Sequence, residues 1–83
     1  MLKIKVLGPG CDNCKRLAWL AERTANHLGV EMQIEKVTDY VEIMKYPLLS
    51  TPGLVINEKL VASGRVPSEA EITTWLADAL EKA

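Results

Sequence analysis

The chain of 83 residues contains two cysteines, Cys11 and Cys14, separated by Asp12 and Asn13. Two thiols at this spacing can form a disulfide, contribute to a metal site, or alternate between dithiol and disulfide. Residues three apart in a helix have Cα atoms about 5 Å apart, which lies within the range a disulfide needs. As a structural staple such a bond is weak, because so short a loop removes little unfolded-state entropy.

A zinc site within one chain is excluded by its ligands. A structural zinc ion takes four ligands, and besides the two cysteines the chain has a single histidine, His27. If one helix carries both, His27 lies about 24 Å from Cys11, so one ion cannot touch them both. We therefore assign no metal ligand within the chain. Zinc or an iron–sulfur cluster held between two chains, each donating both cysteines, stays open as an alternative.

The first half of the sequence predicts a strand, a helix and a second strand. Apolar residues alternate with charged ones over 2–6 and again over 30–35. Between them, apolar residues recur at intervals of three and four from Asp12 to Leu28, which predicts an amphipathic helix with the buried stripe Cys14, Leu17, Ala18, Ala21, Ala25 and Leu28. Two strands joined by a helix should be parallel, so Lys3 and Lys5 should lie across from Glu31, Gln33 and Glu35.

The second half predicts a short helix, a hairpin and a last helix. Asp39 and Glu42 have capping-box spacing ahead of the short helix, which should end near Pro47. Residues 53–64 alternate around a turn at Asn57 and Glu58. Pro67, Ser68 and Glu71 open the last helix, with the buried stripe Ile72, Trp75, Leu76, Ala79 and Leu80. The order is βαβαββα, an α/β fold with a four-stranded mixed sheet and three helices.

This order places both cysteines just past the end of the first strand and at the start of the first helix, where open α/β sheets carry their chemistry. Unpaired N–H groups and the helix dipole stabilise a thiolate there. We expect Cys11, nearest the helix end, to be the attacking sulfur. Cys14, on the apolar stripe, is then the resolving thiol.

Several motifs carry a family resemblance. The order βαβαββα with C-x-x-C after the first strand resembles the thioredoxin fold, and "STPGLVI" resembles the Thr-Pro turn that holds a cis proline against the disulfide in that fold. The stretches "GPGCDNCKRL", "IEKVTD", "EIMKY" and "VASGRVPS" are similar to the archaeal and bacterial family called redox-active disulfide protein 2. The resemblance covers essentially the whole chain, as one thioredoxin-like domain over 1–83.

The resemblance implies the strand order second, first, third, fourth, with the first and last helices on one face and the short helix on the other. It also implies a thiol–disulfide oxidoreductase without a bound cofactor. Cys11 and Cys14 are its catalytic residues, and Thr51, Pro52 and Gly10 bind substrate beside Cys11. The implied partners are protein disulfides and, as reductant, a thioredoxin-reductase-like flavoprotein or a low-molecular-weight thiol.

The sequence departs from the thioredoxin pattern around the cysteines. Gly10 stands where thioredoxins have Trp, and Asp12-Asn13 separates the cysteines in place of Gly-Pro or Pro-Tyr. The first strand carries no carboxylate that could accept a proton. We expect Asp12 to disfavour the Cys11 thiolate and Lys15 to offset part of that effect.

Composition limits the other function classes. Apolar residues make up 48% and charged residues 25%, with a net charge of -1, so the chain offers no basic surface for DNA or RNA. The N-terminal stretch is too short and too charged for a signal peptide, and no apolar run is long enough to span a membrane. We expect a cytoplasmic monomer. Trp19 is either a partner contact or an exposed aromatic, and residues 46–49 form either an apolar rim around Cys11 or loop packing.

Overall fold

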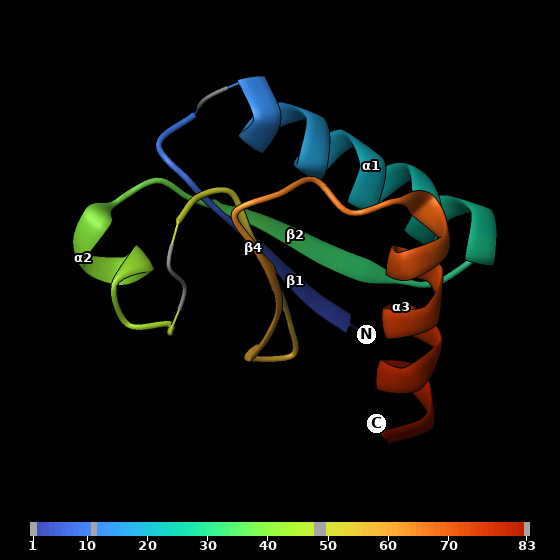
Figure 1. Cartoon of the computed structure of the whole chain (residues 1–83). Coiled ribbons are helices and arrows are strands. Elements are labelled where there is room, and N and C mark those ends of the chain that lie inside the picture. The colour runs from blue at the N-terminus through green and yellow to red at the C-terminus, as the bar shows by residue number, and fades with distance from the viewer. Residues whose placement is uncertain (1, 11, 48–49, 83) are drawn as a thin grey trace.

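The computed structural model describes residues 2–10, 12–47 and 50–82, apart from the side chain of Lys82. Its elements follow the predicted order βαβαββα (Figure 1). They are β1 (Leu2–Leu7), α1 (Asp12–Leu28), β2 (Met32–Val37), α2 (Tyr40–Ile43), β3 (Gly53–Ile56), β4 (Lys59–Ser63) and α3 (Glu69–Lys82). The predicted α/β class is confirmed.

The four strands form one mixed sheet in the order β2-β1-β3-β4, as predicted. β1 is parallel to β2 and antiparallel to β3, and β3 and β4 form the hairpin. Lys3 lies opposite Gln33 and Lys5 opposite Glu35. Parallel pairing brings the carboxyl ends of β1 and β2 to the same edge of the sheet, where the Gly8 N–H donates to the Val37 carbonyl at 3.0 Å.

Each face of the sheet has its own core because side chains alternate along a strand. On one face, Leu2, Ile4 and Val6 pack with apolar residues of α1 and α3. On the other face, Leu7 and Val55 pack with Ile43 of α2. α1 and α3 therefore share one face and α2 covers the opposite one, as the resemblance implied.

Two predicted core residues are exposed. Leu28 is 41% and Leu80 is 47% exposed. The core contacts of α1 end at Ala25 and those of α3 end at Ala79, so the periodic stripe continues in sequence beyond the part of each helix that packs. Both assignments to the core were wrong. Trp75 and Ala79 are partly buried and pack against the core, as expected.

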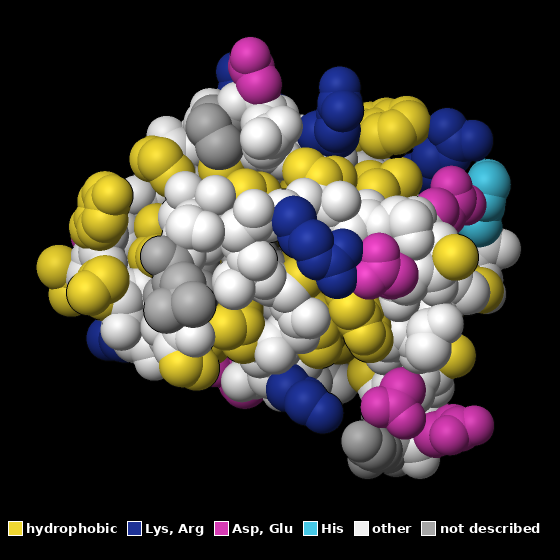
Figure 2. Space-filling view, viewed as in Figure 1, with side chains coloured by type: hydrophobic (Ala, Val, Ile, Leu, Met, Phe, Trp, Pro, Cys, Tyr) yellow, Lys and Arg dark blue, Asp and Glu magenta, His cyan; other side chains and the backbone are white. Residues whose placement is uncertain are grey.

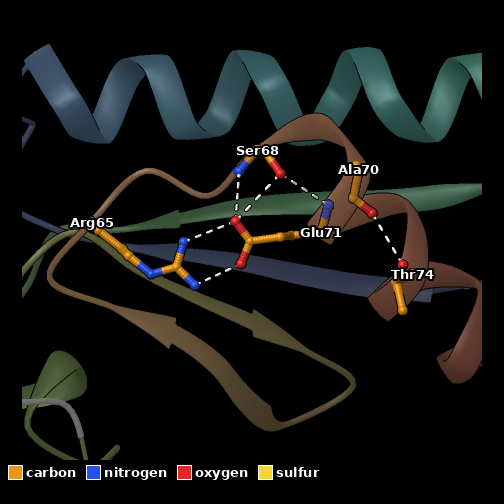
Figure 3. A network of polar contacts seen from close by, with 5 residues as sticks. All are labelled: Arg65, Ser68, Ala70, Glu71 and Thr74. Carbon is orange, nitrogen blue, oxygen red and sulfur yellow. Dashed lines mark hydrogen bonds and ion pairs between the residues drawn. The ribbon is translucent and has the colours of Figure 1, made fainter.

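The hairpin turn and one of the two capping boxes form as predicted. Asn57 and Glu58 both have positive φ, 50° and 69°, which fits a tight two-residue turn. Ser68 and Glu71 cap α3 reciprocally, each backbone N–H donating to the other's side chain at 3.2 Å (Figure 3). At α2, Asp39 accepts a hydrogen bond from the Val41 N–H, but Glu42 pairs with Lys45. The capping box predicted for Asp39 and Glu42 is therefore only half formed.

Lys5 takes its charged partner from the hairpin. Its ammonium lies 2.8 Å from a carboxylate oxygen of Glu58 and donates to the Tyr46 hydroxyl at 3.0 Å. The hydrogen bond to Glu58, followed by the one to Tyr46, raises the pKa of Lys5. Tyr46 also packs beside Leu7 and Val55, so it belongs to the core under α2. For Tyr46, loop packing is the correct alternative, and Leu48 and Leu49 lie outside the described residues.

Some apolar side chains remain on the surface. Tyr40, Val41 and Met44, on or next to α2, are exposed, and Figure 2 shows hydrophobic side chains gathered at the end of the molecule that α2 forms. Trp19 is 56% exposed and lies under the Arg23 guanidinium at 5.3 Å from its ring centroid. An exposed Trp19 stacked with Arg23 fits the exposed-aromatic alternative.

Candidate active site

Cys14 lies in the first turn of α1 and is buried, with 5% of its surface exposed. The amphipathic pattern of α1 explains this position, because Cys14 continues the stripe that packs Leu17, Ala18 and Ala21 against the sheet. Cys11, which precedes α1 by one residue in the sequence, lies outside the described residues. Its role as attacking sulfur therefore stays a prediction.

Gly8 forms the wall against which the Cys14 sulfur lies. A Cβ built on Gly8 would overlap the Cys14 Sγ and would lie 3.3 Å from the Cys14 Cβ. Gly8 is buried, and its N–H is held by the Val37 carbonyl. The end of β1 is thus fixed directly against the Cys14 sulfur.

The Thr51-Pro52 turn also lies close to Gly8. The Thr51–Pro52 peptide bond is cis, Thr51 is half-buried and Pro52 is buried. The Thr51 Cβ lies 3.8 Å from the position that a Cβ on Gly8 would take. Gly8 therefore adjoins both Thr51 and Cys14, so the fold brings these three parts of the chain together.

The segment after β4 is hydrogen-bonded to the Thr51-Pro52 turn. The Gly64 N–H donates to the Pro52 carbonyl at 2.8 Å, and Gly64 has a φ of 77°. The next residue, Arg65, makes a two-pronged ion pair with Glu71 at 3.0 and 2.7 Å (Figure 3). This pair, with hydrogen bonds from Ser68, lowers the pKa of Glu71 to about 2. The ion pair ties the segment that supports Pro52 to the start of α3.

Of the predicted substrate-binding and modulating residues, Gly10 and Lys15 line a small cavity together with Cys14. Gly10 is exposed and has a φ of 93°, which explains a glycine there on backbone grounds alone. Asp12 and Lys15 are exposed in the first turn of α1. Their positions are compatible with an electrostatic effect on the neighbouring thiols.

A small cavity of about 30 Å³ adjoins Cys14. It has room for about two water molecules, so it is too small for a cofactor. Its lining consists of Val6, Gly8, Gly10, Cys14, Lys15, Lys36 and Thr38. Sequence reasoning missed Gly8, Lys36 and Thr38. Parallel pairing of the first two strands was the available signal, because it brings the residues that end the second strand beside those that follow the first.

A larger hollow than the one beside Cys14 lies away from this residue. It has a volume of about 470 Å³ and lies between the hairpin and α3, where its lining includes Leu60, Val61 and Trp75. None of the residues predicted to act in chemistry lines it.

Two further observations concern metals and membranes. Within residues 2–10, 12–47 and 50–82 there is no group of three or more His, Cys, Asp or Glu side chains placed to hold a metal ion. The helices of the described ranges include none with the length and apolar character that crossing a membrane requires.

Comparison with known proteins supports the expectation raised by the motifs. Residues 2–77 match a family model described as a thioredoxin domain. A thioredoxin of Methanothermobacter thermautotrophicus is 36% identical over 77 residues, covering 93% of this chain and all of the relative. A thioredoxin of Methanocaldococcus jannaschii is 33% identical over 81 residues, covering 98% of this chain and 93% of the relative. Among solved structures, glutaredoxin 1 from Francisella tularensis, complexed with cacodylate, matches with a TM-score of 0.47 and 16% identity over 98% of this chain and 99% of that one.

Proposed function

Because the chain belongs to the thioredoxin family, we propose that it is a thiol–disulfide oxidoreductase in which Cys11 attacks and Cys14 resolves. Family membership supports a redox role in general. The observation that carries the finer proposal is the position of Cys14, buried in the first turn of α1 beside the Thr51-Pro52 turn.

The reaction transfers two electrons from the protein dithiol to a substrate disulfide. The Cys11 thiolate attacks one substrate sulfur, the substrate S–S bond breaks, and the other substrate sulfur leaves as a thiolate that takes up a proton. Cys14 then loses its proton to solvent and attacks the Cys11 sulfur. The mixed disulfide breaks, the second substrate thiol is released, and Cys11 and Cys14 end as an internal disulfide.

The burial of Cys14 supports its assignment as the resolving thiol. Cys14 is 5% exposed, and its sulfur lies against Gly8 at the end of β1, so bulky reagents have little access to it. A resolving thiol of this kind does not compete for bulky substrates. It needs only to reach the sulfur of Cys11, three residues earlier in the chain.

We assign substrate binding to Thr51, Pro52 and Gly10. An extended substrate chain would pair with the backbone of Thr51 as an added strand does, with Gly10 on the open side of the cysteines. The half-buried Thr51 and exposed Gly10 are compatible with this placement. A thioredoxin-reductase-like flavoprotein or a low-molecular-weight thiol would reduce the internal disulfide. A cytoplasmic location and a monomeric state stay predictions.

Reduction of insulin disulfides by the purified protein, with dithiothreitol as final reductant, tests the proposal. The wild type should accelerate insulin precipitation. Cys11→Ser should abolish this effect, and Cys14→Ser should trap substrate as a mixed disulfide. A wild type without activity, carrying stoichiometric metal or iron and sulfide after anaerobic purification, would favour the alternative of a cluster between two chains.

A further inference from the structure

We propose that Gly8 is a positioning residue for the resolving thiol: its missing side chain leaves the space in which the Cys14 sulfur lies. The inference rests on the proposed exchange reaction for its functional consequence. The contact between Gly8 and the Cys14 sulfur does not depend on that reaction and can be tested separately.

A steric reason for this glycine follows from comparison with its neighbour in the same loop. Gly10 has a φ of 93° and nothing within 4 Å of a Cβ built on it, so its role is conformational. At Gly8 the requirement is steric, since its φ does not lie in the left-handed region and a Cβ there would overlap the Cys14 Sγ. The φ of Gly8 therefore does not demand glycine, whereas the space taken by the Cys14 sulfur does.

The backbone around Gly8 cannot easily withdraw from an added side chain. Its N–H is bonded to the Val37 carbonyl, and Leu7 before it pairs with Gly53 in β3. The Thr51 Cβ lies in van der Waals contact with the added Cβ, at 3.8 Å. A cavity of about 30 Å³ adjoins Cys14 and offers its sulfur room to shift. A methyl group at position 8 should therefore move the sulfur.

Moving the sulfur should affect the disulfide state more than the dithiol state. A free thiol can relieve part of the overlap by rotating about χ1, at some cost because Cys14 is buried, whereas a sulfur bonded to Cys11 has no such freedom. A methyl group at position 8 should thus destabilise the internal disulfide relative to the dithiol and slow the step in which Cys14 attacks the mixed disulfide.

Gly8→Ala is the variant that tests this, with Gly29→Ala as matched control. Gly29 ends α1 with a φ of 67° and has open space around its Cβ position, so its alanine variant is strained without touching the cysteines. In glutathione redox buffers, Gly8→Ala should lower the equilibrium constant for forming the internal disulfide at least tenfold, or about 30 mV. Gly29→Ala should leave it unchanged. The rate at which iodoacetamide labels Cys11 in the reduced protein should change less than twofold in both.

A stability cycle tests the contact independently of any activity. Under reducing conditions, Gly8→Ala should lower the urea midpoint of unfolding, and the loss should fall by more than half when Cys14→Ala has removed the sulfur. If Gly8→Ala does not fold alone, the added Cys14→Ala change should restore folding. Three results would overturn the inference. Gly8→Ala could lower the urea midpoint equally with Cys14 and with Cys14→Ala, or Cys14→Ala could fail to restore folding of an unfolded Gly8→Ala variant. The third is a Gly8→Ala variant that forms the internal disulfide with the wild-type equilibrium constant. If Cys14→Ala reduces the midpoint loss caused by Gly8→Ala but the wild type reduces no disulfide, the proposed function is refuted and the contact between Gly8 and Cys14 is still supported.

Discussion

At the scale of single residues, we expect the two thiols to differ in reactivity because the packing of α1 buries Cys14. Cys14 is 5% exposed and belongs to the apolar stripe of the helix. We predict that limited iodoacetamide treatment of the reduced protein labels Cys11 and leaves Cys14 unmodified, as mass mapping of peptides would show. Denatured protein, in which both thiols are accessible, is the control. Equal labelling in the folded state would contradict the assigned roles.

Asp12 should make the active-site disulfide harder to reduce. It is exposed at the first position of α1, next to Cys11 in the sequence, and its negative charge disfavours a neighbouring thiolate. Asp12→Asn should lower the Cys11 pKa by less than about one unit and raise the redox potential by about 10–20 mV. Thiolate absorbance against pH and equilibration with dithiothreitol would measure both.

An opposite or absent change in Asp12→Asn would show that the carboxylate serves the helix start and not the thiol. Lys15→Gln is the complementary variant, because it removes a positive charge from the same turn and should raise the Cys11 pKa.

At the scale of elements, the segment between β4 and α3 is held by the ion pair of Arg65 with Glu71. This pair, joined by hydrogen bonds from Ser68, lowers the pKa of Glu71 from 4.5 to about 2. A carboxyl whose pKa is lower in the folded state stabilises the fold above its unfolded pKa and loses this effect as pH falls through the folded pKa. The contribution should therefore be complete above about pH 5 and disappear towards pH 2.

Glu71→Gln tests whether the charge of the Glu71 carboxylate stabilises the fold. We predict a lower urea midpoint than wild type at pH 7 and a difference that shrinks as pH falls from about 5 to about 2. Glu81→Gln, which changes an exposed carboxylate at the far end of the same helix, should show no such pH-dependent loss. Because Glu71 is solvent-accessible, salt should also reduce the effect at pH 7. A difference independent of pH would mean that the side chain acts through packing.

At the scale of the whole molecule, periodicity and short connections predicted the element order, and the family resemblance implied the strand order and the placing of helices on both faces of the sheet. It did not predict where the core stops, because Leu28 and Leu80 continue the apolar period past the packed part of their helices. It also missed Gly8, Lys36 and Thr38 at the site. Contacts between the ends of two strands depend on register, which no local pattern specifies.

Alanine substitutions of Leu17 and Leu28 would measure where the packed part of α1 ends. Both fall on the apolar stripe of α1, yet Leu17 is fully buried between α1 and the sheet while Leu28 is 41% exposed at the end of the helix. Leu17→Ala should cost about 2–5 kcal/mol, since it removes buried methyl groups and leaves a cavity. That loss is a large share of the stability of so small a domain.

Leu28→Ala should cost less than about 1 kcal/mol, because little apolar surface is returned to water. Urea unfolding of the two variants beside wild type gives both values. Similar losses would mean that the core extends along the whole predicted stripe, so that the helix packs on the sheet over its last turn as well.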